Sequence, residues 1–278
     1  MSQAPLITLN DGVQIPQLGL GVWQLTDEQT FTSSAAALAA GYRHIDTAMI
    51  YGNEAGVGRA IAESDVPRED IFITTKLWNA DHGFDKTLRA YDASLKLLGL
   101  EKVDLYLIHW PLPSKNAYPA SWRALVQLQK EGRVRSIGVS NFNADHLERI
   151  IDDSGVKPSV NQIEIHPDFV QQNLLQFCQS LNIHTESWSP LGQGGELLNQ
   201  PILRRIAARQ ARTVAQVVLR WHLQVGHIVI PRSSNTDRIV QNFSVFDFEL
   251  SAEDMAEIAA IEQVKRLGPD PATFNLGA

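Results

Sequence analysis

The stretch GYRHIDTAMIYGNE, residues 41–54, contains a short apolar run that ends at Asp46, and Tyr51 follows in an expected loop. Two further runs end in the same way: FITTKLW delivers Lys76, and VDLYLIHWP delivers His109. The pattern predicts three strands with proton-handling side chains at their ends. Parallel strands bring their carboxyl ends to one face of a sheet, so we expect these four side chains to converge on one pocket.

Short apolar, β-branched runs recur along the whole chain between longer helical patterns. The remaining runs are LGLGVW (18–23), VRSIGVS (134–140), VNQIEIH (160–166), IHTESWS (183–189) and HIVIPRS (227–233). From the Asp46 run onward, the strand ends follow one another at intervals of 22 to 45 residues, each long enough for one strand and one helix. Eight such units predict an α/β fold, a (β/α)₈ TIM barrel, with a doubly wound open sheet as the alternative.

The segments between these runs predict helices for the outer ring of the barrel. Three of them are EQTFTSSAAALAAG (28–41), FDKTLRAYDASLKLLG (84–99) and YPASWRALVQLQKEG (118–132). The last two end at a Gly that suits the position after a helix. Because no Pro-rich or Ser-rich linker interrupts the pattern, we expect a single domain over residues 1–278.

Three further segments fall outside the simple repeat. LITLNDGVQIP (6–16) predicts a β-hairpin that caps the barrel's bottom, because Asp-Gly supplies the positive φ of a tight turn. The longest interval holds a Gly-rich loop (189–200), expected to act as a lid, and an extra helix (213–223). The tail, residues 264–278, has no periodicity, and we expect it to be irregular and to fold over the barrel mouth.

Composition excludes several classes of protein. The formal net charge is −7 with dispersed basic residues, which argues against nucleic acid and anionic membranes as partners. The single cysteine, Cys178, forms no intrachain disulfide and is expected to be a buried structural thiol. A signal-peptide pattern is missing at the N-terminus, and no apolar run reaches the roughly 20 residues of a membrane span, so we expect a cytoplasmic protein.

The four strand-end residues suit the protonation of a developing alkoxide. A Tyr hydroxyl has a pKa near 10, and the ammonium of Lys76 would lower the pKa of Tyr51, while Asp46 would keep Lys76 charged. His109 would donate an N–H to a substrate carbonyl oxygen. The alternative is a purely structural Asp46–Lys76 ion pair, with His109 filling space and Tyr51 on a solvated loop.

Reduction also needs a hydride, which implies a nicotinamide cofactor. Gly19-Leu20-Gly21 lacks the third Gly of a Rossmann fingerprint, so the dinucleotide must be held elsewhere. Four residues around an expected helix start suit a phosphate: Arg232, Ser233, Ser234 and Arg238. Two arginines favour the 2′-phosphate of NADP, although a phosphate-bearing substrate or simple helix capping by Ser234 and Asn235 would also explain the segment.

Tryptophans gather at the predicted mouth of the barrel. Trp23, Trp78, Trp110 and Trp188 each lie close to a strand end, and we expect the first three to line the substrate pocket together with His109. The alternating stretch QIEIH (162–166) does not match the helical zinc pattern His-Glu-x-x-His, so we expect no metal.

With these residues in place, the chain closely resembles the aldo-keto reductases along its whole length. The motifs that carry the resemblance occur in the family's order: GYRHIDTAMIYGNE, ITTKLW, LYLIHWP, GRVRSIGVSNF, VNQIEIHP and IPRSSN. The resemblance implies Tyr51 as general acid, Lys76 and Asp46 as its tuning pair, and His109 as the group that orients the substrate.

The same resemblance implies a set of cofactor contacts. Ser140, Asn141 and Gln162 would bind the nicotinamide carboxamide, and Trp188 would stack on the ring; other cofactor positions are Ser189, Leu191, Gln193, Arg238 and Asn242. Trp188 is similar to the residue of the bacterial 2,5-diketo-D-gluconate reductase branch, which suggests keto-sugar acids or similar small carbonyls. Arg232 replaces a common Lys of the family and keeps the cation.

We therefore predict a monomeric, NADPH-dependent reductase of aldehydes and ketones. Two alternatives remain open at this point. A Schiff-base lyase could use Lys76 if the pKa of Lys76 were depressed. A regulatory protein could bind the cofactor and turn over little.

Overall fold

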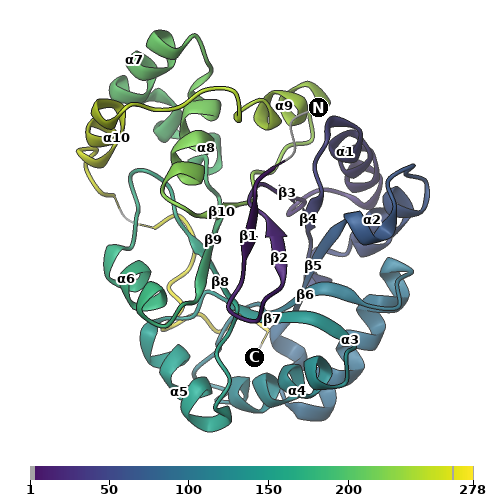
Figure 1. Ribbon diagram of the computed structural model, residues 1–278. Coiled ribbons are helices and arrows are strands. Elements are labelled where there is room, and N and C mark those ends of the chain that lie inside the picture. Colours follow the sequence, from purple (N-terminus) through teal and green to yellow (C-terminus); the bar gives the residue numbers. More distant parts are fainter. Residues whose placement is uncertain (1–3, 265, 278) are drawn as a thin grey trace.

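The computed structural model describes residues 4–264 and 266–277. Its centre is a sheet of eight parallel strands, joined in the order β3 to β10 and surrounded by helices (Figure 1). The strands are β3 (Leu20–Gly21), β4 (His44–Asp46), β5 (Phe72–Leu77), β6 (Val103–Ile108), β7 (Val134–Ser140), β8 (Val160–Glu164), β9 (His184–Trp188) and β10 (Ile228–Val229).

The sheet closes on itself between its first and last strands. Gly19 N donates to Val229 O at 2.9 Å, and Gly21 N donates to Pro231 O at 3.1 Å. Pro231 has no N–H to give to a ladder, which fits the short extent of β10. The predicted (β/α)₈ barrel is confirmed, and the open sheet is excluded.

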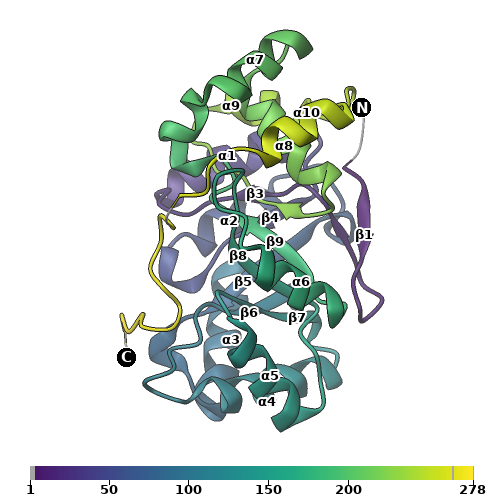
Figure 2. The same cartoon turned by 90° about the vertical axis from the view of Figure 1, so that its left-hand side faces the viewer.

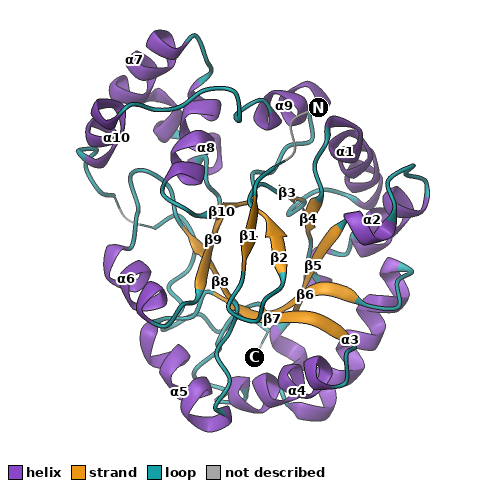
Figure 3. Cartoon of the chain, viewed as in Figure 1, coloured by secondary structure: helices purple, strands orange, loops and turns teal. Residues whose placement is uncertain are grey.

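Residues 4–264 and 266–277 contain ten α-helices and five 3₁₀ turns, which lie between or after the strands (Figure 3). The α-helices are α1 (Asp27–Ala40), α2 (Glu54–Ala62), α3 (Phe84–Leu98), α4 (Tyr118–Lys130), α5 (Ala144–Ser154), α6 (Gln172–Ser180), α7 (Pro201–Gln210), α8 (Val214–Gln224), α9 (Thr236–Phe243) and α10 (Ala252–Ala259). The 3₁₀ turns are η1 (Met49–Tyr51), η2 (Arg68–Asp70), η3 (Asn79–Asp81), η4 (Gly192–Gly194) and η5 (Glu196–Asn199). None of the helices in the described part of the chain is long and apolar enough to cross a membrane.

The predicted helix ends have the expected local chemistry. Helix α1 begins with a capping box between Thr26 and Gln29. Helices α3 and α4 are followed by Gly99 and Gly132, with φ of 65° and 72°. Gly adopts this left-handed conformation at no steric cost, because it has no Cβ. The interval between β9 and β10 holds two helices, α7 and α8, as the sequence indicates.

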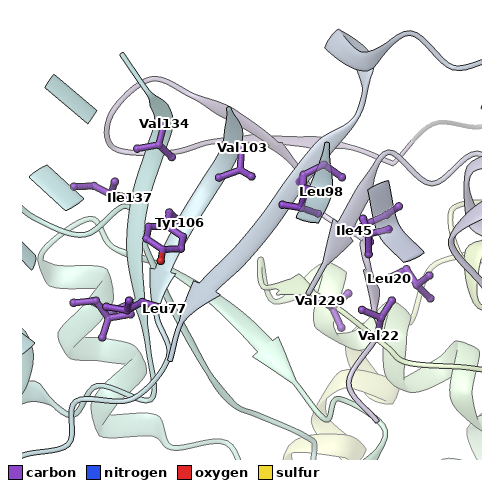
Figure 4. Packing of buried hydrophobic residues seen from close by; sticks show 14 of the residues in the cluster. Leu20, Val22, Ile45, Leu77, Leu98, Val103, Tyr106, Val134, Ile137 and Val229 are labelled. Atoms are coloured by element: carbon purple, nitrogen blue, oxygen red, sulfur yellow. The ribbon is translucent and has the colours of Figure 1, made fainter. Parts of the chain in front are cut away.

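The core follows from the two-residue period of the strands. On β6, Tyr106 and Ile108 belong to the outer cluster that packs against the helices. Figure 4 shows Tyr106 in this cluster with Leu98 and Val134. Leu105 and Leu107, which alternate with them along the strand, belong to a second cluster inside the barrel. Cys178 is buried in the outer layer, and burial raises the pKa of its thiol to about 11, consistent with a structural role.

The two ends of the barrel are covered by different parts of the chain. The predicted hairpin forms as β1 (Leu6–Thr8) and β2 (Gln14–Pro16), and Gly12 in its turn has φ of 85°. Ile15 is fully buried in the interior cluster with Phe72 and Leu105. The C-terminal tail crosses the opposite end (Figure 2). The hairpin therefore plugs the bottom, and the tail covers the mouth, as expected.

Candidate active site

The structure brings the four predicted chemical side chains together at the carboxyl end of the barrel. Asp46 ends β4, Lys76 lies near the end of β5, His109 follows β6, and Tyr51 ends the turn η1. Lys76 Nζ donates to Asp46 Oδ1 at 2.5 Å and to the Thr47 carbonyl at 2.8 Å. The same Nζ lies 5.2 Å from the centre of the Tyr51 ring. We call these four residues the tetrad.

The ammonium of Lys76 is held in its charged form. Burial alone would lower the pKa of Lys76, but the negative charge of Asp46 and the hydrogen bond that Lys76 donates to it act against burial, and the pKa is raised. A nucleophilic lysine needs the opposite shift, so the environment of Lys76 does not favour Schiff-base chemistry. Burial raises the pKa of Asp46, while Lys76 and a hydrogen bond from Gln162 act against this rise.

The pKa of Tyr51 shifts in the direction opposite to the one expected. Burial raises the pKa of Tyr51 above 10, and the nearby Lys76 only partly counteracts that rise. Lys76 does act to lower this pKa, as expected, but the net shift is upward, against the expectation of a value below the ordinary one. The physical reason is that the phenolate would be desolvated as well as beside an ammonium, and desolvation dominates. Tyr51 consequently keeps its proton at neutral pH.

His109 is a neutral imidazole beside Tyr51. Burial, with a smaller effect from Lys76, holds the pKa of His109 well below 6.5. Its ring centre lies 5.6 Å from that of Tyr51 and 5.3 Å from that of Trp78, both in edge-on geometry. Its Nδ1 has no hydrogen-bond partner among the described residues. A neutral ring has one N–H to donate, as substrate orientation requires.

The residues expected at the nicotinamide form one connected polar group beside His109. Ser140 Oγ donates to the Gln162 carbonyl at 2.9 Å, and Asn141 Nδ2 donates to the His109 carbonyl at 3.0 Å. Trp188 Nε1 donates to Asn141 Oδ1 at 2.8 Å. Asn141 has φ of 62°, a left-handed conformation that Asn tolerates. The Trp188 ring remains half-exposed at the mouth.

The expected phosphate site lies at the start of α9. Asn235 is the helix cap, since its Oδ1 accepts from Arg238 N at 2.9 Å, whereas Ser234 is exposed. Arg232 Nε donates to the Trp23 carbonyl at 3.0 Å, which positions its guanidinium. Among the described residues, neither Arg232 nor Arg238 forms an ion pair with a carboxylate. Two such cations beside a helix N-terminus suit a phosphate chemically.

The other expected cofactor residues lie in the segments after β9 and β10. Ser189 and Leu191 are half-buried just after β9, and Gln193 is exposed in η4. Ser233 is buried beside the cap, where its Oγ accepts from Asn235 N at 3.1 Å, and Asn242 is buried in α9. These positions follow β9 and β10, the strands that precede the expected cofactor loops.

The tryptophans divide by exposure. Trp110 is buried and its ring packs 4.3 Å from that of Phe274, a tail residue that sequence reasoning missed because the tail has no periodic pattern. Trp23 is 42% exposed and contacts the site through its backbone. A buried carboxyl, Glu186, was also missed as a functional group, although the pattern marked it as a strand end.

Two further features bear on the choice of site. Within residues 4–264 and 266–277, no group of three or more His, Cys, Asp or Glu side chains is placed to hold a metal ion. A crevice of about 1000 Å³ lies on the outer wall between α6, α8 and α10, and contains none of the tetrad. The chemistry therefore concentrates at the barrel mouth.

Comparisons with known proteins agree with this geometry. The sequence model of the Aldo/keto reductase family matches residues 17–263. An aldo-keto reductase of Mycolicibacterium smegmatis is 57% identical over 272 residues, which cover 98% of each chain. The methylglyoxal reductase DkgA of Escherichia coli K12 is 49% identical over 276 residues, covering 99% of this chain and all of the relative.

Solved structures give the same result. A mutant of Gox0644 in complex with NADPH superposes with a TM-score of 0.94 at 49% identity, covering 98% of this chain and 99% of that chain. An aldo/keto reductase from Brucella melitensis gives a TM-score of 0.90 at 54% identity, covering 92% of this chain and 99% of that chain.

Proposed function

Because this chain belongs to the aldo/keto reductase family, whose members are NADP-dependent oxidoreductases, we propose that it reduces small aldehydes and ketones to alcohols with NADPH. The observation that carries the proposal is the buried Asp46–Lys76 pair beneath a protonated Tyr51, with neutral His109 beside it. These groups are arranged to deliver a proton to a carbonyl oxygen.

The residues at the mouth fit a nicotinamide dinucleotide. Gln162 Nε2 donates hydrogen bonds to two carboxyl groups. Its side-chain carbonyl oxygen could therefore accept a hydrogen bond from a carboxamide. Ser140 and Asn141 would help to orient the same group, and the half-exposed Trp188 ring offers a stacking face. Arg232, Ser234 and Arg238 would hold the 2′-phosphate. When bound, the cofactor supplies the hydride.

Each member of the tetrad then has one task. His109 donates its N–H to the substrate oxygen and fixes the orientation of the carbonyl. Tyr51 gives its hydroxyl proton to that oxygen as negative charge develops there. Lys76 stabilises the resulting phenolate, and Asp46 keeps Lys76 charged. Trp78, Trp110 and Phe274 would exclude water from the reacting carbonyl.

The relatives suggest which carbonyls to test. DkgA is named a methylglyoxal reductase, so we infer a small oxo-aldehyde or a keto-sugar acid such as 2,5-diketo-D-gluconate as the substrate. We also expect the protein to act as a cytoplasmic monomer. Titration with NADPH and NADH, followed by a panel of aldehydes and keto acids, tests cofactor and chemistry together. If NADPH binds but no carbonyl compound of the panel oxidises it, the result would favour a regulatory protein.

The sharpest test of the proton donor is Tyr51→Phe. We expect kcat to fall by at least about 100-fold, because general acid catalysis contributes roughly that much, while NADPH affinity stays within about twofold. Tyr106→Phe is the matched control: its hydroxyl is also buried and has no hydrogen-bond partner among the described residues. Near wild-type turnover in Tyr51→Phe would refute the assignment.

A further inference from the structure

Glu186 is buried on β9, a strand that pairs with β8 and β10 and with none of the strands of the tetrad. It is fully buried, in register with Gln162 on β8. Gln162 Nε2 donates to Glu186 Oε2 at 2.8 Å, and the same nitrogen donates to Asp46 Oδ2 at 2.8 Å. One amide nitrogen therefore bridges the carboxyl of Glu186 and the carboxyl that holds Lys76.

The surroundings of Glu186 offer it no cation of its own. The Nζ of Lys76 is used by Asp46 and the Thr47 carbonyl. Glu186 Oε1 has no hydrogen-bond partner among the described residues, and it lies 3.7 Å from His44 Nε2. That imidazole is neutral, because burial lowers the pKa of His44 to about 3. Two buried carboxyls thus share one ammonium, and one carboxyl must carry a proton near neutral pH.

Glu186 is the carboxyl that carries this proton. Asp46 forms the close ion pair, whereas Glu186 has only a shared amide hydrogen bond. Burial, together with the negative charge of Asp46, raises the pKa of Glu186 to about 8. The ionisable groups that interact with it are His44 and Asp46 from β4, Lys76 from β5, and Tyr51 at the mouth. Its proton is therefore lost only in the alkaline range.

We propose that Glu186 is a positioning residue for the proton donor. Through Gln162, Glu186 holds Asp46 beneath Lys76, and when Glu186 is ionised, Tyr51 keeps its hydroxyl proton up to a higher pH. The catalytic part of this inference rests on the proposed function. An added negative charge in the cluster disfavours a phenolate at Tyr51, so Tyr51 remains a proton donor to higher pH when Glu186 is ionised.

The test is the pH profile of kcat for carbonyl reduction in Glu186→Gln. Gln has the same shape and can still accept from Gln162, but it cannot ionise. We expect the alkaline limb, where Tyr51 loses its proton, to move to lower pH by about half a unit or more. Glu186→Asp, which keeps the charge, should restore most of that shift. A limb in Glu186→Gln that coincides with the wild-type limb would overturn the proposal.

Glu54→Gln is the matched control. Glu54 is also a buried carboxyl, but it accepts from Thr75 Oγ1 at 2.6 Å and has no bond to Gln162. We expect the alkaline limb of the kcat profile of Glu54→Gln to lie at the same pH as in the wild type. A shift equal to that of Glu186→Gln would mean that any nearby buried charge acts in this way, which would also overturn the specific role of Glu186.

A second readout does not depend on turnover. Carbon-13 labelling of the tyrosine ring, with Tyr51 assigned through Tyr51→Phe, reports the titration of Tyr51 in the cofactor-free protein. We expect the pH at the midpoint of the Tyr51 titration to be lower in Glu186→Gln than in the wild type, and to be the same as in the wild type in Glu54→Gln. If wild-type protein reduced no carbonyl while this midpoint moved, the proposed function would fail and the coupling would stand. If turnover were present and the midpoint did not move, the coupling would fail alone.

Discussion

Lys76 and Arg232 illustrate how two cations in one site are given different tasks by their surroundings. Lys76 is fully buried and bonded to Asp46, so its charge is available only to groups inside the barrel, above all Tyr51. Arg232 is exposed, and two backbone carbonyls, of Trp23 and Gln24, orient its guanidinium. A guanidinium oriented in this way can bind a phosphate from solution at little cost in side-chain entropy.

Arg232→Ala should therefore separate the two nicotinamide cofactors. We expect NADPH affinity to fall by about tenfold or more, because a charged hydrogen bond contributes roughly 1.5–3 kcal/mol. NADH lacks the 2′-phosphate, so its affinity should change by less than about threefold. Fluorescence titration with each cofactor measures both constants.

Arg205→Ala is a suitable control for this experiment. Arg205 is an exposed arginine on α7 that pairs with Glu257, away from the start of α9. Its removal should leave both affinities unchanged. Equal losses for NADPH and NADH in Arg232→Ala would contradict the 2′-phosphate role.

At the scale of elements, β8 anchors the C-terminal tail over the mouth. Glu164 at the end of β8 accepts from Leu267 N at 2.6 Å and from Gly268 N at 3.0 Å. His166 Nε2 lies 3.1 Å from the same carboxylate, which lowers the pKa of Glu164 despite its burial. The tail is thereby held against Trp188: a Cβ on Gly268 would lie only 2.5 Å from Trp188 Cη2.

Gly268→Ala tests whether this contact sets the position of Trp188. The added methyl group must displace the tail or the ring, and a displaced ring would stack less well on a nicotinamide. We expect the KM for NADPH to rise several-fold, with a smaller change in kcat. Thr273→Ala changes an exposed side chain of the same tail and should behave as wild type. An unchanged KM for NADPH and an unchanged kcat in Gly268→Ala would show that the tail does not set the position of Trp188.

At the scale of the whole molecule, stability and chemistry occupy opposite ends of the barrel. The hairpin buries Ile15 among Phe72, Leu105 and Leu107 at the bottom, while the tetrad and the tail lie at the mouth. This separation is typical of barrels, because the loops that follow the strands gather at one end. Substitutions at the bottom should therefore affect folding and leave catalysis unchanged.

Ile15→Ala is expected to lower the free energy of unfolding by about 2–5 kcal/mol, because Ile15 is fully buried and leaves a cavity. Urea denaturation measures this loss, and the KM values of the folded protein should be those of the wild type. Leu6→Ala, on the same hairpin but 57% exposed, should cost less than about 1 kcal/mol. A large change in KM for Ile15→Ala would show that the two ends are coupled.

The amino-acid sequence by itself determined the eight barrel strands in their order, the N-terminal hairpin and helices α1, α3, α4 and α8 between the strands. Apolar, β-branched runs with polar residues at their ends can be read locally, and so can caps such as Gly99. It also determined that Asp46, Tyr51, Lys76 and His109 would meet, because parallel strands bring their ends to one face. Both predictions depend on patterns that repeat within a few tens of residues.

Only the tertiary structure decided how those groups behave. Gln162 meets Asp46 across 116 positions of the chain, and no local pattern predicts that one amide nitrogen would join Asp46 to Glu186. The acidity of Tyr51 depends on how deeply it is buried, which is a property of the assembled barrel, and burial outweighs the effect of Lys76. The place of Phe274 against Trp110 likewise depends on an aperiodic tail held by Glu164. Desolvation and contacts between distant segments arise only when the barrel has closed, and they set the charge states on which the proposed chemistry depends.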